Sequence, residues 1–319
     1  MFLEVEQRLS FAYDAYISES FLELRVQPKT SPHQTLSAFL LAVGPPTKVF
    51  RYRDWNDNAA HHFTITKFHA KIEVLSRSLV DTHPAFPSLA ALTDRLPFQG
   101  LPYAYRDWLQ LGGPIRGTAA LRRFYRSLPR PTATLGPRVA QLAEGIRRQF
   151  AYRKHVTRYD STTEDLLKAG GGVCQDFAHL MLALLRLDGI PCRYVSGYLH
   201  IRSRRSEPAQ SHAWVEFHSP TKGWIGYDPT HGREIDERYV VVAHGRHYDD
   251  VPPNKGIYRG NAREVLATEV HTRPSTRKAI STLHEEIQQI DLPVFQEIPE
   301  RRADRFVPPV EDASAQQQQ

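Results

Sequence analysis

The chain has 319 residues, of which 41% are hydrophobic and 24% are charged, and its formal net charge is +6. This balance is that of a globular protein, so it excludes fibrous, collagenous and wholly disordered classes, and the length predicts about two domains. Only two cysteines occur, Cys174 and Cys192, which excludes a disulfide framework and a cysteine-rich zinc cluster. No leader-like segment and no long apolar run is found, so we expect a cytoplasmic protein without membrane partners.

The positive charge is concentrated in one stretch of the chain. Arginines and lysines crowd between residues 116 and 158, where Glu144 is the only acid. No zinc finger, helix-turn-helix or RNA-binding signature accompanies them. We therefore interpret this stretch as a solvated basic surface and expect no nucleic-acid partner.

Residues 1–82 are predicted to form a β-sandwich-like domain. They divide into short segments rich in Val, Phe, Tyr and Thr, and turn clusters such as Asp54 to Asn58 separate them. The expected strands are residues 3–13, 21–26, 35–43, 48–53, 61–65 and 69–74. Residues 83–136 are punctuated by prolines and are predicted to be a connection with short helices, one of them at residues 119–127.

Residues 137–272 are predicted to form a second domain, which makes the chain α+β. Residues 161–164 have the form of a capping box, and the short helix after them is expected to end at three glycines, residues 170–172. The next helix begins near Cys174, carries apolar residues at helical spacing and ends at Gly189. Three strands are expected to follow, at residues 193–201, 212–218 and 224–228.

Residues 273–319 are predicted to be an extension with a disordered, Gln-rich tail. One helix is plausible at residues 277–290, and the chain ends in four glutamines, residues 316–319. These glutamines can be acyl donors in principle, but a solvated tail is the preferred interpretation because the segment lacks apolar residues.

The two cysteines differ in their surroundings. Cys174 lies in the first turn of a helix after three glycines, where the helix dipole and unpaired N–H groups favour a thiolate. A buried, inert helix cysteine is the alternative for any lone Cys. Cys192 follows Ile190 and Pro191 at a strand start, so we expect it in the core.

A thiolate nucleophile needs a base, and the base needs an orienting group. His212 begins a predicted strand and shares one face with Trp214 by the period of two. If the following turn pairs His218 with Trp224, Asp228 lies opposite Trp214 and diagonal to His212. The Asp228 carboxylate can then hold the imidazole and stabilise its charged form.

Four strings of the sequence together resemble the transglutaminase-like superfamily. They are GVCQDFAHL at 172–180, GIPCRYVSGY at 189–198, SHAWVE at 211–216 and GWIGYDPT at 223–230. The chain is most similar to bacterial members with an N-terminal β domain, over most of residues 1–270. The resemblance implies a papain-like fold in the 137–272 catalytic domain, with Cys174 as nucleophile, His212 as general base and acid, and Asp228 as orienting group.

The sequence departs from the family pattern in two places. His247 stands where the family commonly has Asp, and the turn Asp54 to Asn58 has Asp57 where the family has Gly. Neither change touches the three implied catalytic residues. Four further residues are expected to contact substrate: Trp214, Trp224, Tyr152 and Gln175, although a large aromatic side chain on a central strand is more often part of a core. Tyr152 is also a candidate oxyanion donor beside the Cys174 backbone N–H.

The expected function is thiol-dependent acyl transfer or hydrolysis at an amide of a peptide or protein substrate. The resemblance favours a peptidase or amidase over a protein cross-linking enzyme. The alternative is a non-catalytic peptide-binding or scaffold protein that retains the fold. We expect no cofactor and no metal, because the sequence shows neither an EF-hand ligand pattern nor a helical histidine pair with nearby acids. The oligomeric state is left open.

Overall fold

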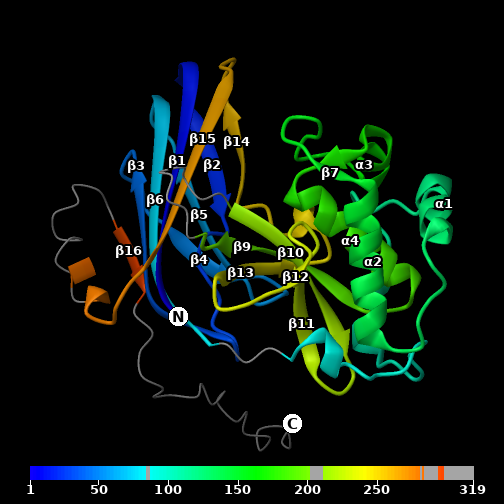
Figure 1. Cartoon of the computed structure of the whole chain (residues 1–319). Coiled ribbons are helices and arrows are strands. Elements are labelled where there is room, and N and C mark those ends of the chain that lie inside the picture. The colour runs from blue at the N-terminus through cyan, green and yellow to red at the C-terminus, as the bar shows by residue number, and fades with distance from the viewer. Residues whose placement is uncertain (84–86, 202–210, 281, 284–293, 298–319) are drawn as a thin grey trace, which may run out of the picture.

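The computed structural model describes residues 1–83, 87–201, 211–280, 282–283 and 294–297. A β-sandwich and a second part, in which helices pack on a sheet, lie side by side (Figure 1). The predicted α+β class is confirmed. The described part of the chain contains no helix long and apolar enough to cross a membrane.

Two antiparallel sheets build the sandwich. The first has the order β15 (Glu264–Pro274), β1 (Phe2–Ile17), β6 (His69–Thr82), β3 (Gln34–Gly44) and β16 (Val294–Glu297). The second has the order β14 (Asn254–Arg259), β2 (Glu19–Leu24), β5 (Ala59–Ile65) and β4 (Phe50–Arg53). Alternate residues of β1, such as Val5, Leu9 and Phe11, are buried between the sheets. Each expected N-terminal strand is present.

Both ends of the sequence contribute to the sandwich. Residues 254–272, which are expected in the second domain, instead form β14 and most of β15, and these strands pair with β2 and β1. Strand periodicity cannot distinguish between two sheets, because pairing with either one buries the same alternate side chains. The helix expected at residues 277–290 falls mostly outside the described residues, and the terminal glutamines lie outside them altogether.

The second part is built on a sheet in the order β12 (Arg233–Glu234), β11 (Gly223–Asp228), β10 (Ser211–Ser219), β9 (Cys192–Leu199) and β13 (Tyr239–Gly245). Its helices are α1 (Ala119–Ser127), α2 (Leu135–Gln149), α3 (Thr163–Ala169) and α4 (Cys174–Leu187). The apolar side chains of α4 are buried against β9 and β10. Short 3-10 segments lie at Leu89–Ala91, Tyr103–Leu109 and Tyr248–Asp250, and β7 (Ala151–Tyr152) pairs in parallel with β8 (Gly171–Gly172).

The start of α3 differs from the expectation by one residue. Thr162, rather than Ser161, is the N-cap, and its side chain accepts a hydrogen bond from the Asp165 N–H. The Asp165 carboxylate in turn accepts from the Thr162 N–H at 2.8 Å. Aspartate therefore serves in this capping box in place of the expected Glu164, because both residue types offer a carboxylate.

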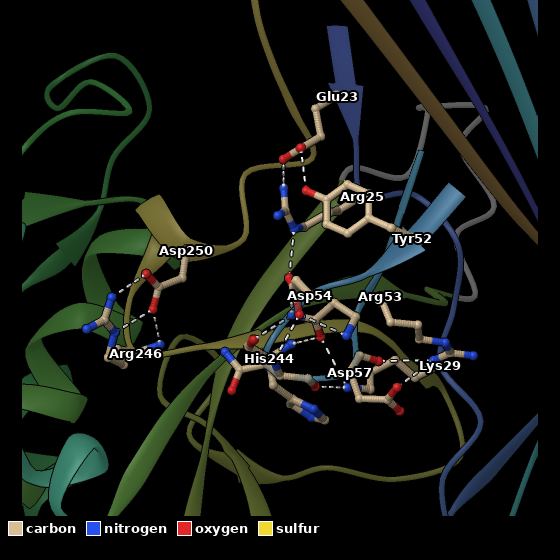
Figure 2. A network of polar contacts seen from close by, with 12 residues as sticks. Glu23, Arg25, Lys29, Tyr52, Arg53, Asp54, Asp57, His244, Arg246 and Asp250 are labelled. Atoms are coloured by element: carbon tan, nitrogen blue, oxygen red, sulfur yellow. Dashed lines mark hydrogen bonds and ion pairs between the residues drawn. The ribbon is translucent and has the colours of Figure 1, made fainter. Parts of the chain in front are cut away.

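The turn from Asp54 to Asn58 joins the sandwich to β13, in the sheet of the other part of the molecule (Figure 2). The Asp54 carboxylate accepts from the Asn58 N–H and the Asn58 side-chain amide, each at 3.0 Å. Asn58 then exchanges two hydrogen bonds with the backbone of His244 on β13, at 2.9 and 2.8 Å. Arg25 lies between Glu23 and Asp54 and pairs with both. Because burial keeps water from these polar groups, they depend on one another for their hydrogen bonds. The turn therefore fixes the position of the sandwich relative to the other part.

Asp57, which stands where the resembling family has Gly, has a φ of 57° and thus a left-handed conformation. Asp tolerates this conformation better than Ala, while Gly adopts it freely. We expect Asp57→Ala to lower the free energy of unfolding by about 1 kcal/mol, whereas Asp57→Gly and Asp57→Asn stay close to the parent. Urea denaturation measures the three variants. Equal stabilities of the Ala and Gly variants would show that the turn carries no such strain.

Candidate functional site

Cys174 is the first residue of α4, as expected. The Asp176 carboxylate folds back over the helix start, accepting from the Val173 N–H at 2.8 Å and from the Thr157 hydroxyl at 2.6 Å. A Cβ on Gly172 would lie 2.5 Å from that carboxylate, so the glycine permits this cap. The glycines before Cys174 thus allow the helix to begin at the thiol, where its N-terminal dipole acts.

His212 lies between Cys174 and Asp228. Strands β10 and β11 pair in the expected register, with His218 opposite Trp224, and the His212 Nε2 lies 2.7 Å from the Asp228 Oδ2. Since Nε2 is directed at the carboxylate, Nδ1 is the ring nitrogen left for the hydrogen bond with the Cys174 side chain. Burial lowers the pKa of His212, but the hydrogen bonds with Asp228 and Cys174 outweigh burial and raise it to about 9.

The Asp228 carboxylate is fully buried and accepts several hydrogen bonds. The Oδ1 atom accepts from the backbone N–H groups of Thr230 and His231, at 2.9 and 3.2 Å. The Oδ2 atom accepts from the Tyr239 hydroxyl at 2.8 Å, and His231 Nδ1 lies 2.6 Å from it. Although burial opposes ionisation, the hydrogen bonds with His212 and His231 hold the pKa of Asp228 far below its usual range. The carboxylate is therefore a permanent negative charge beside His212.

Cys174 and His212 open into a cavity of about 390 Å³. Part of its wall comes from the α4 region, including Tyr152 and Gln175, and from Tyr194 on β9. Another part comes from the sandwich, through Gln7 on β1 and Thr268 on β15. The cavity therefore lies where the two parts of the molecule meet.

The four expected substrate-contacting residues divide into two pairs. Tyr152 and Gln175 line the cavity, and the Gln175 side-chain amide donates to the Tyr159 carbonyl at 2.7 Å. Neither Trp214 nor Trp224 belongs to the cavity lining that the described residues form. Trp214 is fully buried and packs on Tyr239 with ring centroids 5.3 Å apart.

Trp224 packs elsewhere, against Trp108 and His218 and under the Arg193 guanidinium. Trp224 therefore lies away from the cavity that holds Cys174, and its contact with substrate stays a prediction. Trp224 does share a sheet face with Asp228, but four residues of strand separate the two by about 13 Å. The period of two identifies the sheet face on which Trp224 lies, but it does not show which part of that face lies next to the cavity.

The remaining sequence-based assignments concern Cys192 and His247. Cys192 is fully buried, with its Sγ 3.5 Å from the Leu182 carbonyl oxygen, and burial raises the pKa of its thiol to about 11. It is a core residue, as expected. His247 packs closely against Gly113, and its Nδ1 lies 3.6 Å from the Asp249 carboxylate. His247 is outside the lining of the cavity.

Two residues around Asp228 were not expected from the sequence. His231 follows Asp228 in the string Asp-Pro-Thr-His, and the hydrogen bond from the Thr230 N–H to Asp228 forms an Asx turn, so its position has a local signal. Tyr239 has no such signal, since the chain first passes through β12 before it returns to Asp228.

His212, Asp228 and His231 also form a group whose ligand atoms lie within 4.8 Å of one another. Each of the two rings directs a nitrogen at the same carboxylate oxygen, at 2.7 and 2.6 Å. This geometry is that of hydrogen bonds to a carboxylate, in which each imidazole donates a proton. We therefore interpret the group as a hydrogen-bond network around a buried charge.

Known proteins resemble this chain in both sequence and fold. Residues 122–229 match the transglutaminase-like superfamily, and residues 3–81 match the bacterial transglutaminase-like N-terminal region. The uncharacterized protein ML0607 of Mycobacterium leprae is 32% identical over 286 residues, covering 83% of this chain and 95% of that protein. A protein-glutamine gamma-glutamyltransferase of Pseudomonas aeruginosa is 31% identical over 170 residues, covering 48% of this chain and 25% of the relative.

A solved structure from Cytophaga hutchinsonii, provisionally described as a cysteine protease, shares the fold. Its TM-score is 0.72 at 20% identity, and the match covers 86% of this chain and 92% of that one. The arrangement of a sandwich beside a helix-and-sheet domain therefore occurs in another protein.

The raised pKa of His212 predicts how stability depends on pH. A group whose pKa rises from 6.5 to about 9 on folding contributes stability that is complete below pH 6.5 and is lost as the pH rises through 9. We expect the difference in unfolding free energy between the parent and His212→Gln to shrink over this range. Chemical denaturation at several pH values measures it, with His271→Gln, at an exposed histidine, as the control. A difference that does not change with pH would contradict the assignment.

Proposed function

This chain belongs to the transglutaminase-like superfamily, and we propose that it catalyses thiol-dependent acyl transfer or hydrolysis at an amide bond of a peptide or protein. One observation carries the proposal. Cys174, at a helix start, shares a cavity and a hydrogen bond with His212, whose far side is held at 2.7 Å by the buried carboxylate of Asp228. These are the parts of a thiol nucleophile, a general base and an orienting group.

The charge state of the site supports an activated thiol. With its pKa at about 9, His212 carries a proton at neutral pH while it is hydrogen-bonded to Cys174. A protonated imidazole and a helix N-terminus both stabilise a thiolate. Asp228 stabilises the imidazolium in turn, so a positive charge is held beside the Cys174 sulfur.

In the proposed reaction the Cys174 sulfur attacks the amide carbonyl carbon, and the carbonyl oxygen becomes an oxyanion. The Cys174 backbone N–H, which has no intrahelical acceptor at a helix start, donates to this oxyanion. His212 then gives its proton to the leaving amine as the C–N bond breaks, which leaves an acyl-thioester. Water or a second amine attacks the thioester, its proton passes to His212, and the thiolate is released with the product.

We propose hydrolysis as the main outcome. Transfer to an amine requires that water be kept from the thioester. The cavity wall carries the side chains of Ser196, Ser211 and Thr268, which hold water readily, so water reaches the acyl-enzyme. A peptidase or amidase therefore fits this cavity better than a protein cross-linking enzyme.

Thiol alkylation tests the activated nucleophile. We expect iodoacetamide to label Cys174 at pH 6–7 at least tenfold faster than free cysteine, because a protonated His212 and a helix N-terminus both favour the reactive thiolate form. His212→Ala should slow the labelling at least tenfold. Cys192→Ser, which removes a buried thiol, is the control and should leave the rate unchanged. Labelling of Cys174 at the rate of free cysteine would instead favour the non-catalytic peptide-binding alternative.

A capped peptide library, incubated with and without a fluorescent primary amine, distinguishes the two acceptors. We expect cleaved or deamidated products whose yield is little changed by the amine and which are absent with Cys174→Ala. Mass spectrometry identifies the products. If the amine is incorporated into most of the product, the enzyme is a transferase and the preference for water is wrong.

A further inference from the structure

The sandwich lines the cavity that holds Cys174. Gln7 and Leu9 of β1 and Thr268 and Val270 of β15 belong to the cavity wall. Gln7 is buried, and its side-chain carbonyl accepts from the Tyr198 hydroxyl at 2.6 Å. This contact leaves the Gln7 amide N–H groups to donate toward a bound molecule.

A second cavity of about 670 Å³ continues the first one along the sandwich. Tyr248 and Asn254 line both cavities. On β15, Glu264 and Leu266 line the second cavity, and Thr268 lines the first. These three side chains share one face of β15 because of the period of two. From Glu264 to Val270 this face extends for about 20 Å.

The strands beside this groove are sheet edges. Among the described residues, β15 ends the first sheet and β14 ends the second, and the chain passes directly from β14 to β15 (Figure 1). An edge strand presents unpaired backbone N–H and C=O groups at which an extended chain can add. Apolar side chains are exposed here, since Leu266 is 38% exposed and Ile257 is 75% exposed. Natural edges are normally protected, so an exposed apolar edge next to a cavity indicates a binding surface.

We propose that the β15 edge binds an extended polypeptide on one side of the reacting amide. The acyl donor is then a peptide with about six residues on that side, rather than a small amide. The length follows from the 20 Å of β15 and the rise of a strand, about 3.4 Å per residue. The inference rests on the proposed function, because it places the reacting amide at Cys174. It also assigns a role to the N-terminal β-sandwich: its strands select long, extended substrates.

Two neighbouring residues of β15 provide matched variants. Leu266 lines the second cavity, whereas Val265 is 65% exposed and points to the opposite face of the same strand. Leu266→Glu places a charge in the groove, and Val265→Glu places the same charge outside it. Leu266→Ser removes the apolar contact without adding charge, in case the glutamate disturbs folding, and thermal melting confirms that each variant is folded.

The probes are fluorescein-labelled, capped peptides in which a run of two, four or six Ala and Thr residues lies on one side of a single reactive glutamine, and they are made in two series, with the run before or after the glutamine. Fluorescence anisotropy measures their binding to the Cys174→Ala chain, and kcat/KM is measured on the chain with Cys174 present. We expect affinity and kcat/KM to rise at least tenfold from two to six residues. Leu266→Glu should remove this gain while leaving the shortest peptide unchanged, and Val265→Glu should change neither.

Equal binding of short and long peptides would overturn the proposal, as would an equal loss for all lengths in Leu266→Glu. Binding to the Cys174→Ala chain requires no chemistry, so it separates two failures. Length-dependent binding without turnover contradicts the proposed reaction and retains the groove. Turnover that is independent of length contradicts the groove and retains the reaction.

Discussion

The hydrogen bond between Asp228 and His212 is the interaction on which the rest of the site depends. A buried carboxylate is costly unless donors surround it, and here they come from the Asx turn, from His231, from Tyr239 and from His212. The β10 and β11 register brings His212 to this carboxylate, and the return of the chain on β13 brings Tyr239 to it. The same charge then keeps His212 protonated beside Cys174, so one electrostatic constraint connects fold and chemistry.

The β-sandwich takes part in the site. Its wall of the cavity comes from β1 and β15, strands that lie at opposite ends of the sequence and pair directly. The Asp54 to Asn58 turn bonds to β13, which pairs with β9, and β9 carries the cavity residue Tyr194. The sandwich is thus bonded to the sheet that carries His212 and Asp228, and its position relative to that sheet is set by buried hydrogen bonds.

The success and failure of the sequence-based predictions have a common cause. The register that brings Asp228 to His212 was predictable because β10 and β11 are consecutive strands joined by a short turn. The helix start at Cys174 was predictable because glycines and helical periodicity are local signals. The positions of Trp214 and Trp224 were not predictable. Periodicity places both side chains on the sheet face of His212, but it does not show that Trp214 lies in the core and Trp224 against Trp108.

The sequence by itself determined the α+β class, the N-terminal strands and the approach of Asp228 to His212, because each depends on contacts between near neighbours in the chain, while the place of Cys174 beside them was implied by the family resemblance. Only the tertiary structure decided that β14 and β15 complete the sandwich, that Tyr239 reaches Asp228, and that Gln7 and Thr268 lie in the same cavity as Cys174. Such contacts join residues as far apart in the sequence as Leu3 and Pro274. They are selected by the packing of the whole molecule, which no local pattern records.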